Sequence, residues 1–398
     1  MKYRRGLLPL SADPVTNGHL NIIERAADVC DELVVLACDN DTKRGKYLFD
    51  RATRGQLLER AVRKLSRSNI TVRTSDRLLV DEFLEEGAEA LFRGIRDDKD
   101  RAEEEHQMRY HELILPGITA KVVYLEAEER WREVSSTMVK AFASHHIDIA
   151  PYVPIFVKAA VEEVICHQWK IGITGEMASG KSYVSRELAK LLAERGYEAA
   201  IINFDQLVRD FCAEQSHGAT RARHRFGELL GADVLTSDRK NVRLNELYGR
   251  LFSPDVKADV RGEIRLLIAP NLERLYRQAL RSARGIVLIE RAQFAELELG
   301  ALVNHRLIVV ESPERAAFLT KRGVTAAHAA NVGRTQWNAD RKITALSAAA
   351  ERAGMGLILH YENRRTEHAG TDASLLALVD ELLTHIPAHF ARTPGGAS

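Results

Sequence analysis

Short apolar runs alternate with longer amphipathic stretches along the first 165 or so residues of the chain. The first run is followed by a Pro/Thr/Asn/Gly turn and then by a helical pattern over residues 19–29. Alternation of this kind predicts a parallel sheet covered by helices. The runs that predict strands are residues 6–10, 32–38, 70–73, 90–92 and 121–125.

The same alternation begins again near His167, with almost no linker. Because 398 residues exceed the roughly 250–300 that one hydrophobic core usually serves, two domains are expected. We predict an α/β fold with two parallel-sheet domains, residues 1–166 and 167–386, and a flexible tail over residues 387–398. The strand-like runs of the second domain are residues 170–174, 198–203, 285–289 and 306–310, and its first helix is residues 181–195.

Composition and charge narrow the class of protein. A hydrophobic content of 45% with 28% charged residues is typical of a soluble globular protein. A net charge of +1 gives no reason to expect a nucleic acid or an anionic membrane surface as partner. No apolar stretch reaches the ~18 residues of a membrane span, and the N-terminus is too short in apolar residues for a secretion signal. Cys30, Cys38, Cys166 and Cys212 form no CxxC pair, which indicates reduced thiols and a cytoplasmic protein.

The most specific motif lies in the second half, where residues 175–182 read Gly-Glu-Met-Ala-Ser-Gly-Lys-Ser and fit GxxxxGK[ST]. A predicted strand precedes this segment and a predicted helix follows it, as a phosphate-binding loop requires. Backbone N–H groups then point at one anion, Lys181 reaches the β- and γ-phosphates of ATP, and Ser182 can hold Mg²⁺. The predicted ATP-binding residues are Gly175, Ala178, Ser179, Gly180, Lys181 and Ser182.

A candidate base follows the next predicted strand. Asp205 has Arg209 one turn later on the same helical face. A carboxylate at a strand end beside the phosphate loop can accept the proton of an attacking hydroxyl, although the same residue could equally be a helix cap.

Residues 170–383 resemble dephospho-coenzyme A kinases. The likeness rests on the phosphate loop, on Phe-Asp-Gln-Leu-Val-Arg at residues 204–209, on residues 244–252 and on residues 309–314. It implies a C-terminal P-loop kinase in which Asp205 is the base and Arg209 contacts the substrate. It also implies a lid with three candidate arginines, Arg322, Arg334 and Arg341. The chain departs from the family pattern at Glu176, at Ala269-Pro270 and at Glu290-Arg291-Ala292.

The first half carries Asp-Pro-Val-Thr-Asn-Gly-His at residues 13–19, between a predicted strand and a predicted helix. Gly18 allows a close approach of the backbone to a ligand, and His19 lies at the helix N-terminus, where N–H groups favour a phosphate. Alone, such a histidine would more often make a local hydrogen bond. Lys43, Arg93–Arg96 and Ser135–Thr137 also follow strands or open helices, and the loops at the carboxyl ends of parallel strands share one crevice.

Residues 2–165 are similar to phosphopantetheine adenylyltransferases, which implies an N-terminal Rossmann-like nucleotidyltransferase. By this resemblance His19 and Lys43 are catalytic and stabilise the α-phosphate, and Ser11, Lys43 and Arg96 contact the substrate. Leu10 stands where the family has glycine. The residues implied to surround ATP are Ser11, His19, Arg93, Gly94, Arg96, Glu104, Ser135, Ser136 and Thr137.

The two implied reactions are consecutive, and their order along the chain is that of bifunctional coenzyme A synthases. The expected substrates are ATP, 4′-phosphopantetheine and dephospho-coenzyme A, with Mg²⁺ as cofactor, no nucleic-acid or membrane partner, and a homo-oligomer left open. Two alternatives remain at this point. One is a nicotinamide mononucleotide adenylyltransferase joined to a ribosylnicotinamide kinase. The other is an active adenylyltransferase whose second half binds nucleotide without turnover.

Overall fold

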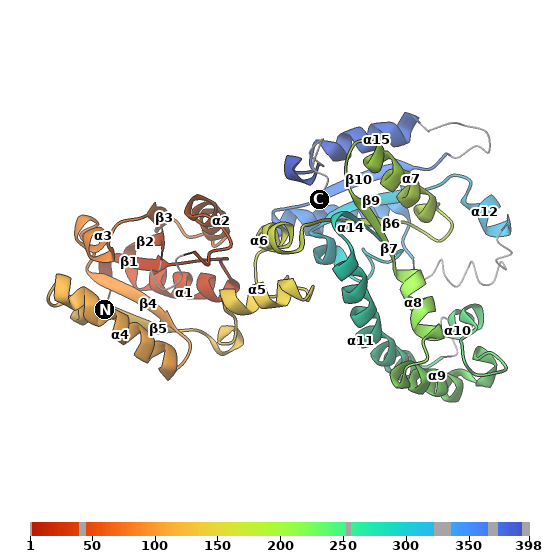
Figure 1. Ribbon diagram of the computed structural model, residues 1–398, viewed down its shortest axis with the longest axis horizontal. Helices are drawn as coiled ribbons and strands as arrows, with labels where there is room; N and C mark the ends of the chain where they lie inside the picture. Colours follow the sequence, from red (N-terminus) through yellow and green to blue (C-terminus); the bar gives the residue numbers. More distant parts are fainter. Residues whose placement is uncertain (1, 40–44, 252–255, 322–335, 365–372, 392–398) are drawn as a thin grey trace. The chain divides into compact units, whose positions relative to one another are not determined.

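The computed structural model describes residues 2–39, 45–251, 256–321, 336–364 and 373–391. The chain forms two compact units, Met1–Ile165 and Cys166–Ser398. Each unit holds one five-stranded sheet in which every pairing is parallel, as the alternation of apolar runs and helices predicts (Figure 1). Among the described residues, no helix combines the length and the hydropathy needed to cross a membrane.

The sheet of the first unit has the strand order β3-β2-β1-β4-β5. The chain starts in the middle, moves outwards through β2 and β3, and then crosses to β4 on the other side of β1. A crevice for ligands forms at such a change of direction, at the carboxyl ends of the strands. The strands are β1 (Tyr3–Leu10), β2 (Cys30–Cys38), β3 (Ile70–Ser75), β4 (Ala90–Ile95) and β5 (Val122–Glu126).

Helices cover the sheet of the first unit because its central strands are apolar on both faces. Leu7 and Leu8 of β1 point to opposite faces and are fully buried. Leu7 packs with Val80 and Met108 from the helices on its side. The α-helices of the first unit are α1 (Asn17–Asp28), α2 (Arg51–Arg63), α3 (Leu79–Glu85), α4 (Asp98–Ile114), α5 (Ser136–Ser144) and α6 (Ile155–Val161).

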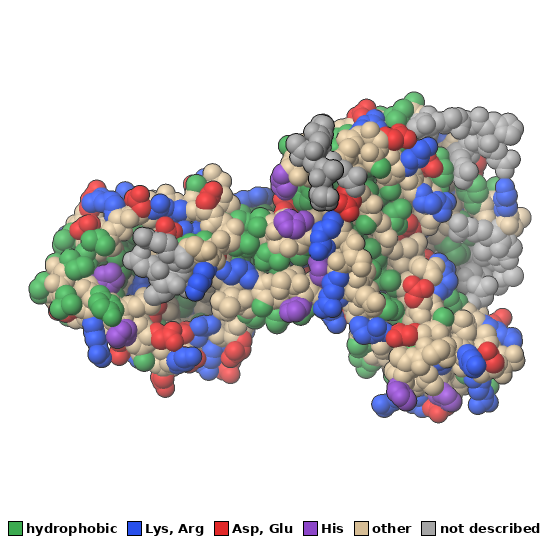
Figure 2. Space-filling view, in the orientation of Figure 1, with side chains coloured by type: hydrophobic (Ala, Val, Ile, Leu, Met, Phe, Trp, Pro, Cys, Tyr) green, Lys and Arg blue, Asp and Glu red, His purple; other side chains and the backbone are tan. Residues whose placement is uncertain are grey.

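Large apolar side chains remain exposed at one end of this unit. They come from α3 with the residue before it and from α4, and Figure 2 shows hydrophobic side chains gathered at that end. The residues are Leu78, Leu84, Tyr110, Leu113 and Ile114.

The sheet of the second unit has the order β10-β9-β6-β8-β7. Helices α7 (Lys181–Glu194) and α15 (Ala373–Leu383) cover one face, through a core that includes Leu188 and Leu378. Helices α11 (Ala258–Ser282) and α14 (Ala339–Ala353) cover the other face, with Leu280 and Leu346. The strands are β6 (Gln168–Thr174), β7 (Ala199–Asn203), β8 (Gly285–Glu290), β9 (Arg306–Glu311) and β10 (Leu357–Glu362).

A helical arm is inserted between β7 and β8 of this sheet (Figure 1). It has a core of its own, which includes Phe211, Phe226 and Leu247. The arm consists of α8 (Phe204–Ala213), α9 (His217–Leu230), α10 (Leu244–Leu251) and the first part of α11 (Ala258–Ser282). The other helices of the unit are α7 (Lys181–Glu194), α12 (Arg315–Lys321), α14 (Ala339–Ala353) and α15 (Ala373–Leu383).

The folded part of the second unit extends past residue 387, so the predicted start of the flexible tail is wrong. Residues Ala388–Phe390 form a short 3₁₀ helix, and Ala391 forms an antiparallel bridge with Tyr197. Phe390 packs against the core beneath α15, which explains why the chain stays ordered here. Residues 392–398 of the predicted tail lie outside the described residues.

The cysteines agree with the prediction of free thiols. Cys30, Cys166 and Cys212 are buried, Cys38 is half-buried, and none forms a disulfide. Burial raises the pKa of Cys30 to about 11, so this thiol stays protonated at neutral pH.

Candidate active sites

His19 is part of the cap that begins α1. The Thr16 hydroxyl accepts a hydrogen bond from the backbone N–H of His19 at 3.3 Å. In return, the imidazole Nδ1 accepts one from the backbone N–H of Thr16 at 3.0 Å. The local hydrogen bond expected of an isolated histidine is therefore present. It also fixes the tautomer: in the neutral ring the proton lies on Nε2, which can donate to an anion.

The loop that carries this motif is in contact with the start of α5. The Ser136 hydroxyl donates to the Pro14 carbonyl at 2.8 Å, and the Ser135 hydroxyl caps α5 by accepting from Met138 N at 3.1 Å. Two helix N-termini, those of α1 and α5, thus lie beside one loop. Their N–H groups make this place suited to an anion. Thr137 is exposed in the first turn of α5.

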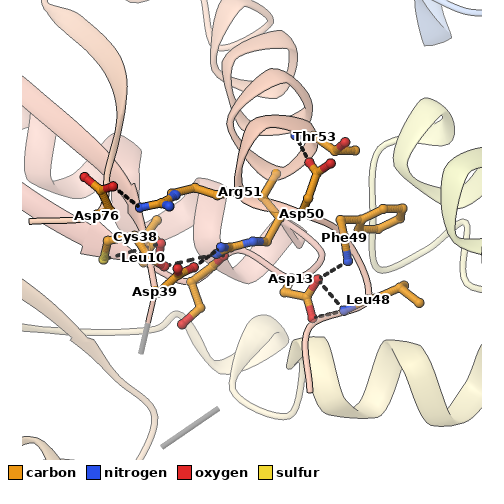
Figure 3. Close-up of polar contacts among 12 residues, drawn as sticks. Leu10, Asp13, Cys38, Asp39, Leu48, Phe49, Asp50, Arg51, Thr53 and Asp76 are labelled. Carbon is orange, nitrogen blue, oxygen red and sulfur yellow. Dashed lines mark hydrogen bonds and ion pairs between the residues drawn. The ribbon is translucent and has the colours of Figure 1, made fainter. Parts of the chain in front are cut away.

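Asp13 is buried and connects the motif to two other segments, of which Figure 3 shows the loop that carries Leu48 and Phe49. Its carboxylate accepts from Leu48 N at 2.9 Å and from Phe49 N at 3.0 Å, in the loop after β2. Lys140 of α5 forms an ion pair with it at 2.9 Å. Lys43 falls in residues 40–44, outside the described residues, but the segment that follows it is held by Asp13.

Arg54 joins the carboxyl ends of β1 and β2. Its buried guanidinium donates to the carbonyls of Ser11 at 2.6 Å and Cys38 at 3.0 Å, and it forms an ion pair with Asp39. Its Cζ also lies 4.1 Å from the centre of the Tyr47 ring. Arg54 therefore fixes the backbone at Ser11, a predicted ATP and substrate contact.

The predicted ATP contacts on β4 and α4 are bound to partners within the unit. Arg93 forms an ion pair with Glu104, so these two predicted residues lie together. Arg96 binds the Asp100 carboxylate with two N–H groups, at 2.6 and 2.8 Å, and these hydrogen bonds lower the pKa of Asp100. Because β4 is parallel to β1 and lies next to it, these arginines are at the same carboxyl end of the sheet as Ser11.

In the second unit, the phosphate loop connects β6 to α7 as predicted. Gly175 has a φ of +148°, and a Cβ there would lie 2.1 Å from the Val310 carbonyl oxygen, so only glycine fits. Ala178, Ser179 and Gly180 complete the turn, with Ser179 buried. The Lys181 ammonium donates to the carbonyls of Gly175 at 3.0 Å and Glu176 at 2.8 Å, and thus lies across the loop.

Glu290 completes this site, and sequence reasoning missed its role. It ends β8, the strand beside β6, and is buried. Its Oε2 accepts from the Ser182 hydroxyl at 2.7 Å and from the Asn203 amide at 2.7 Å. An acidic residue at the end of the strand next to the phosphate loop is the signal that could have found it. A hydroxyl and a carboxylate are hard oxygen donors of the kind Mg²⁺ takes beside a phosphate, so the pair fits that ion.

Asp205 is not the cap of α8, so the capping alternative is wrong. The cap is Asn203, whose side-chain oxygen accepts from Gln206 N at 3.0 Å. Asp205 lies in the first turn and is exposed. Burial lowers the pKa of Arg291, and the negative charge of Asp205 partly offsets this effect. Burial raises the pKa of Tyr248, and the charge of Asp205 raises it further.

A cavity of about 640 Å³ opens between α8 and residues 241–246. Arg209, the predicted substrate contact, lines it and donates from Nε to Gln206 at 3.0 Å. Arg243 from the opposite side adds a second cation. The remaining lining residues are Gln206, Asp210, Ala213, Asn241, Val242, Leu244 and Glu246.

One of the three lid candidates is described. Arg341 lies in α14 with its Cζ 4.0 Å from the centre of the Trp337 ring. This stacking occupies one face of the guanidinium. Arg322 and Arg334 lie outside the described residues.

Comparison with known proteins identifies the first unit. The cytidylyltransferase-like family matches residues 11–142. The phosphopantetheine adenylyltransferase of Pasteurella multocida (strain Pm70) is 35% identical over 158 residues, which is 40% of this chain and 96% of the relative. That of Shouchella clausii (strain KSM-K16) is 34% identical over 161 residues, 40% of this chain and 98% of the relative. The chain belongs to the phosphopantetheine adenylyltransferase family.

The family match lies within residues 11–142, and each of these relatives covers 40% of the chain. The family membership therefore rests on the first unit, the adenylyltransferase unit. A solved structure described as NadR protein in complex with NR covers 100% of this chain and 98% of its own. Its sequence identity is 12% and its TM-score 0.31, values too low to support an argument about function.

Two positioning residues of the adenylyltransferase unit, Asp13 and Arg54, were not assigned a role from sequence. Both are buried charges, which a sequence pattern does not distinguish from a surface carboxylate and a surface helical arginine. Their role follows only from the carbonyls, amides and ions that they contact.

Proposed function

We propose that the first unit transfers the adenylyl group of ATP to 4′-phosphopantetheine, producing dephospho-coenzyme A and pyrophosphate. The family membership of the unit supports this reaction. The observation that carries it is the meeting of the α1 and α5 N-termini beside the His19 loop. Two such helix ends favour the binding of a polyphosphate.

In this reaction an oxygen of the 4′-phosphate attacks the α-phosphorus of ATP. The new P–O bond forms as the bond to the bridging oxygen breaks, and pyrophosphate leaves with that electron pair. His19 donates from Nε2 to an α-phosphate oxygen, because Nδ1 is already bound to Thr16. Positioning and stabilisation of the developing charge supply the catalysis, with Lys43 as a second cation.

The test compares 4′-phosphopantetheine with nicotinamide mononucleotide as acceptors, with pyrophosphate release as the readout. We expect release only with 4′-phosphopantetheine. Release with nicotinamide mononucleotide instead would replace the proposal with the nicotinamide alternative.

We also propose that the second unit transfers the γ-phosphoryl group of ATP to the 3′-hydroxyl of dephospho-coenzyme A. The observation that carries this proposal is the hydrogen bond between Ser182 and Glu290, at the end of an intact phosphate loop. Ser182 and Glu290 would hold Mg²⁺, which neutralises charge on the β- and γ-phosphates. Lys181 would turn from its loop carbonyls to the same phosphates.

Asp205 is the proposed base of this second reaction. It accepts the proton of the 3′-hydroxyl as the oxygen attacks the γ-phosphorus, and ADP leaves with the electrons of the broken P–O bond. The neighbouring cavity, with Arg209 and Arg243 on its wall, is the proposed place of the acceptor, whose pyrophosphate is an anion.

The kinase proposal is tested by supplying dephospho-coenzyme A and ATP to the full chain and following the mass of the product. We expect one added phosphate, which Lys181→Ala abolishes while adenylyl transfer continues. If the unmodified chain adds no phosphate, the second unit is a nucleotide-binding module and the kinase proposal fails.

A further inference from the structure

The phosphate loop carries an acidic side chain, Glu176, at its second position. The Glu176 carboxylate forms an ion pair with Arg315, the first residue of α12, with Oε1 3.2 Å from Nη1. The side chains of Arg315 and Glu176 are only 28% and 23% exposed. Solvent therefore screens this pair less than a typical surface ion pair.

Arg315 also contacts the backbone of the loop. Its Nε donates to the Met177 carbonyl at 3.0 Å, and Met177 N donates to the Gln336 side chain at 2.7 Å. Both backbone polar groups of Met177 are thus held by side chains from outside the loop. The ion pair is part of a specific contact rather than a chance approach of two long side chains.

A second cation near Glu176 is already committed elsewhere. Lys342 is close enough to Glu176 for an electrostatic interaction. Its buried ammonium, however, donates to the Ala292 carbonyl at 2.7 Å and forms an ion pair with Glu296. Among the residues that the structure describes, Arg315 is the cation that forms an ion pair with the Glu176 carboxylate.

A carboxylate on the rim of a phosphate cradle repels the anion that the cradle binds. In a partly buried place, repulsion between like charges that lie near each other is enough to weaken anion binding about tenfold. Neutralisation of Glu176 by an adjacent guanidinium removes most of this repulsion. Glu176 and Arg315 are therefore understood best as a unit.

We propose that Arg315 is a positioning residue whose charge cancels that of Glu176, so that the phosphate loop retains its affinity for ATP. This inference rests on the proposed nucleotide-binding function of the second unit. It predicts that the two residues depend on each other: loss of Arg315 is harmful only while Glu176 keeps its charge.

The experiment uses the full chain and a site-specific readout, because the first unit also binds ATP under the proposal above. Amide hydrogen exchange of a peptide that covers residues 175–182 is followed against Mg·ATP concentration, which gives a half-protection concentration for this loop alone. The variants are Arg315→Met, Glu176→Gln and the two combined. Arg225→Met, which removes the ion pair with Glu263 on α11, is the matched control.

We expect Arg315→Met to raise the half-protection concentration about tenfold, because the charge of Glu176 then repels the triphosphate. The combined variant returns to within about threefold of the unmodified chain, and Glu176→Gln alone binds ATP at least as tightly as that chain. Arg225→Met leaves the concentration unchanged. Hydrogen exchange of a peptide that covers β8, in the core of the same unit, reports that each variant is folded.

Two results overturn the proposal. One is an unchanged half-protection concentration in Arg315→Met. The other is a combined variant as weak as Arg315→Met, which would mean that Arg315 acts through Met177 or on the nucleotide itself. Failure of the kinase reaction does not affect this test, because loop protection by ATP is measured without turnover. Absence of any protection in the unmodified chain would overturn both proposals.

Discussion

The carboxylate of Asp13 offers the sharpest test of how the adenylyltransferase site is held together. Asp13→Asn keeps the volume of the side chain and removes its charge. The Oδ1 atom that accepts from Phe49 N and Leu48 N can be kept as the amide oxygen. The new NH₂ group then replaces Oδ2 and faces two donors, Leu48 N and the Lys140 ammonium.

The cost follows from these contacts. A hydrogen bond to a charged group contributes about 1.5–3 kcal/mol, and a buried donor without a partner costs about 1–3 kcal/mol. Two contacts at Oδ2 become donor against donor and the two at Oδ1 are kept, so we expect the loop at Leu48 and Phe49 to lose about 2–3 kcal/mol. Lys140→Met removes only an ion pair whose lysine side chain is 30% exposed, for which about 1 kcal/mol or less is expected.

The assay is hydrogen exchange at the amides of Leu48 and Phe49, which reports local opening without requiring the two units to unfold together. A loss of 2 kcal/mol corresponds to about 30-fold faster exchange in Asp13→Asn. The turnover number for adenylyl transfer should fall by about tenfold or more, because small displacements of positioning segments are costly. Asp50→Asn is the matched control, since asparagine is as good a cap for α2 as aspartate.

A double variant completes the test. If Lys140 and the new amide repel each other, Asp13→Asn combined with Lys140→Met should cost less than the sum of the two single changes. Unchanged exchange at Leu48 and Phe49 in Asp13→Asn would refute the reasoning, and so would an equal effect of Asp50→Asn.

Three further predictions concern the proposed chemistry. His19→Ala should lower the turnover number of adenylyl transfer by about 10²-fold or more with a smaller change in the KM of ATP, as steady-state kinetics would show; a change in KM alone would contradict a role in the transition state. Glu290→Gln should shift the Mg²⁺ dependence of 3′-phosphorylation to higher concentration, and an unchanged Mg²⁺ titration would remove Glu290 from the metal site. Asp205→Asn should slow 3′-phosphorylation by about 10²-fold while ATP still protects the phosphate loop, and an equal rate would exclude it as the base.

Much of the two sheets could be predicted from the sequence, because buried parallel strands are short apolar runs bounded by polar turns. The run at residues 6–10 corresponds to the end of β1, and the run at residues 285–289 to β8. The strand β10 has only two fully buried positions, Leu359 and Tyr361, and its weaker pattern was not recognised.

The helical arm between β7 and β8 was also not predicted as a separate layer. Its helices are amphipathic, so each one is visible locally. Their packing on one another joins Phe211 to Phe226 and Leu247, and contacts across such sequence separations leave no local signal. The arm matters because the cavity beside Arg209 lies on it.

The phosphate-loop motif located the site of the second unit from sequence, but it did not show which carboxylate near it has which role. Glu290 and Asp205 follow neighbouring strands and both could be taken for a base. Glu290 is buried and its Oε2 already accepts two hydrogen bonds, from Ser182 and Asn203, which suits its proposed role as a metal ligand. Asp205 is exposed in the first turn of α8, the helix whose Gln206 and Arg209 line the cavity, which agrees with its proposed role as the base.

The proposed roles of these two carboxylates, Glu290 as a metal ligand and Asp205 as the base, depend on Asn203. The side-chain oxygen of Asn203 caps α8, and its amide donates a hydrogen bond to Glu290. Asn203 therefore positions the Glu290 carboxylate, and because it caps the helix, Asp205 does not. Asn203→Asp should therefore preserve the cap but place a second negative charge against Glu290, raising the pKa of one of the two carboxyls. We expect 3′-phosphorylation to lose activity below neutral pH in this variant, while Asn203→Ser, which caps without the charge, keeps the original pH profile. Identical pH profiles for the two variants would show that Asn203 does not connect the two sites.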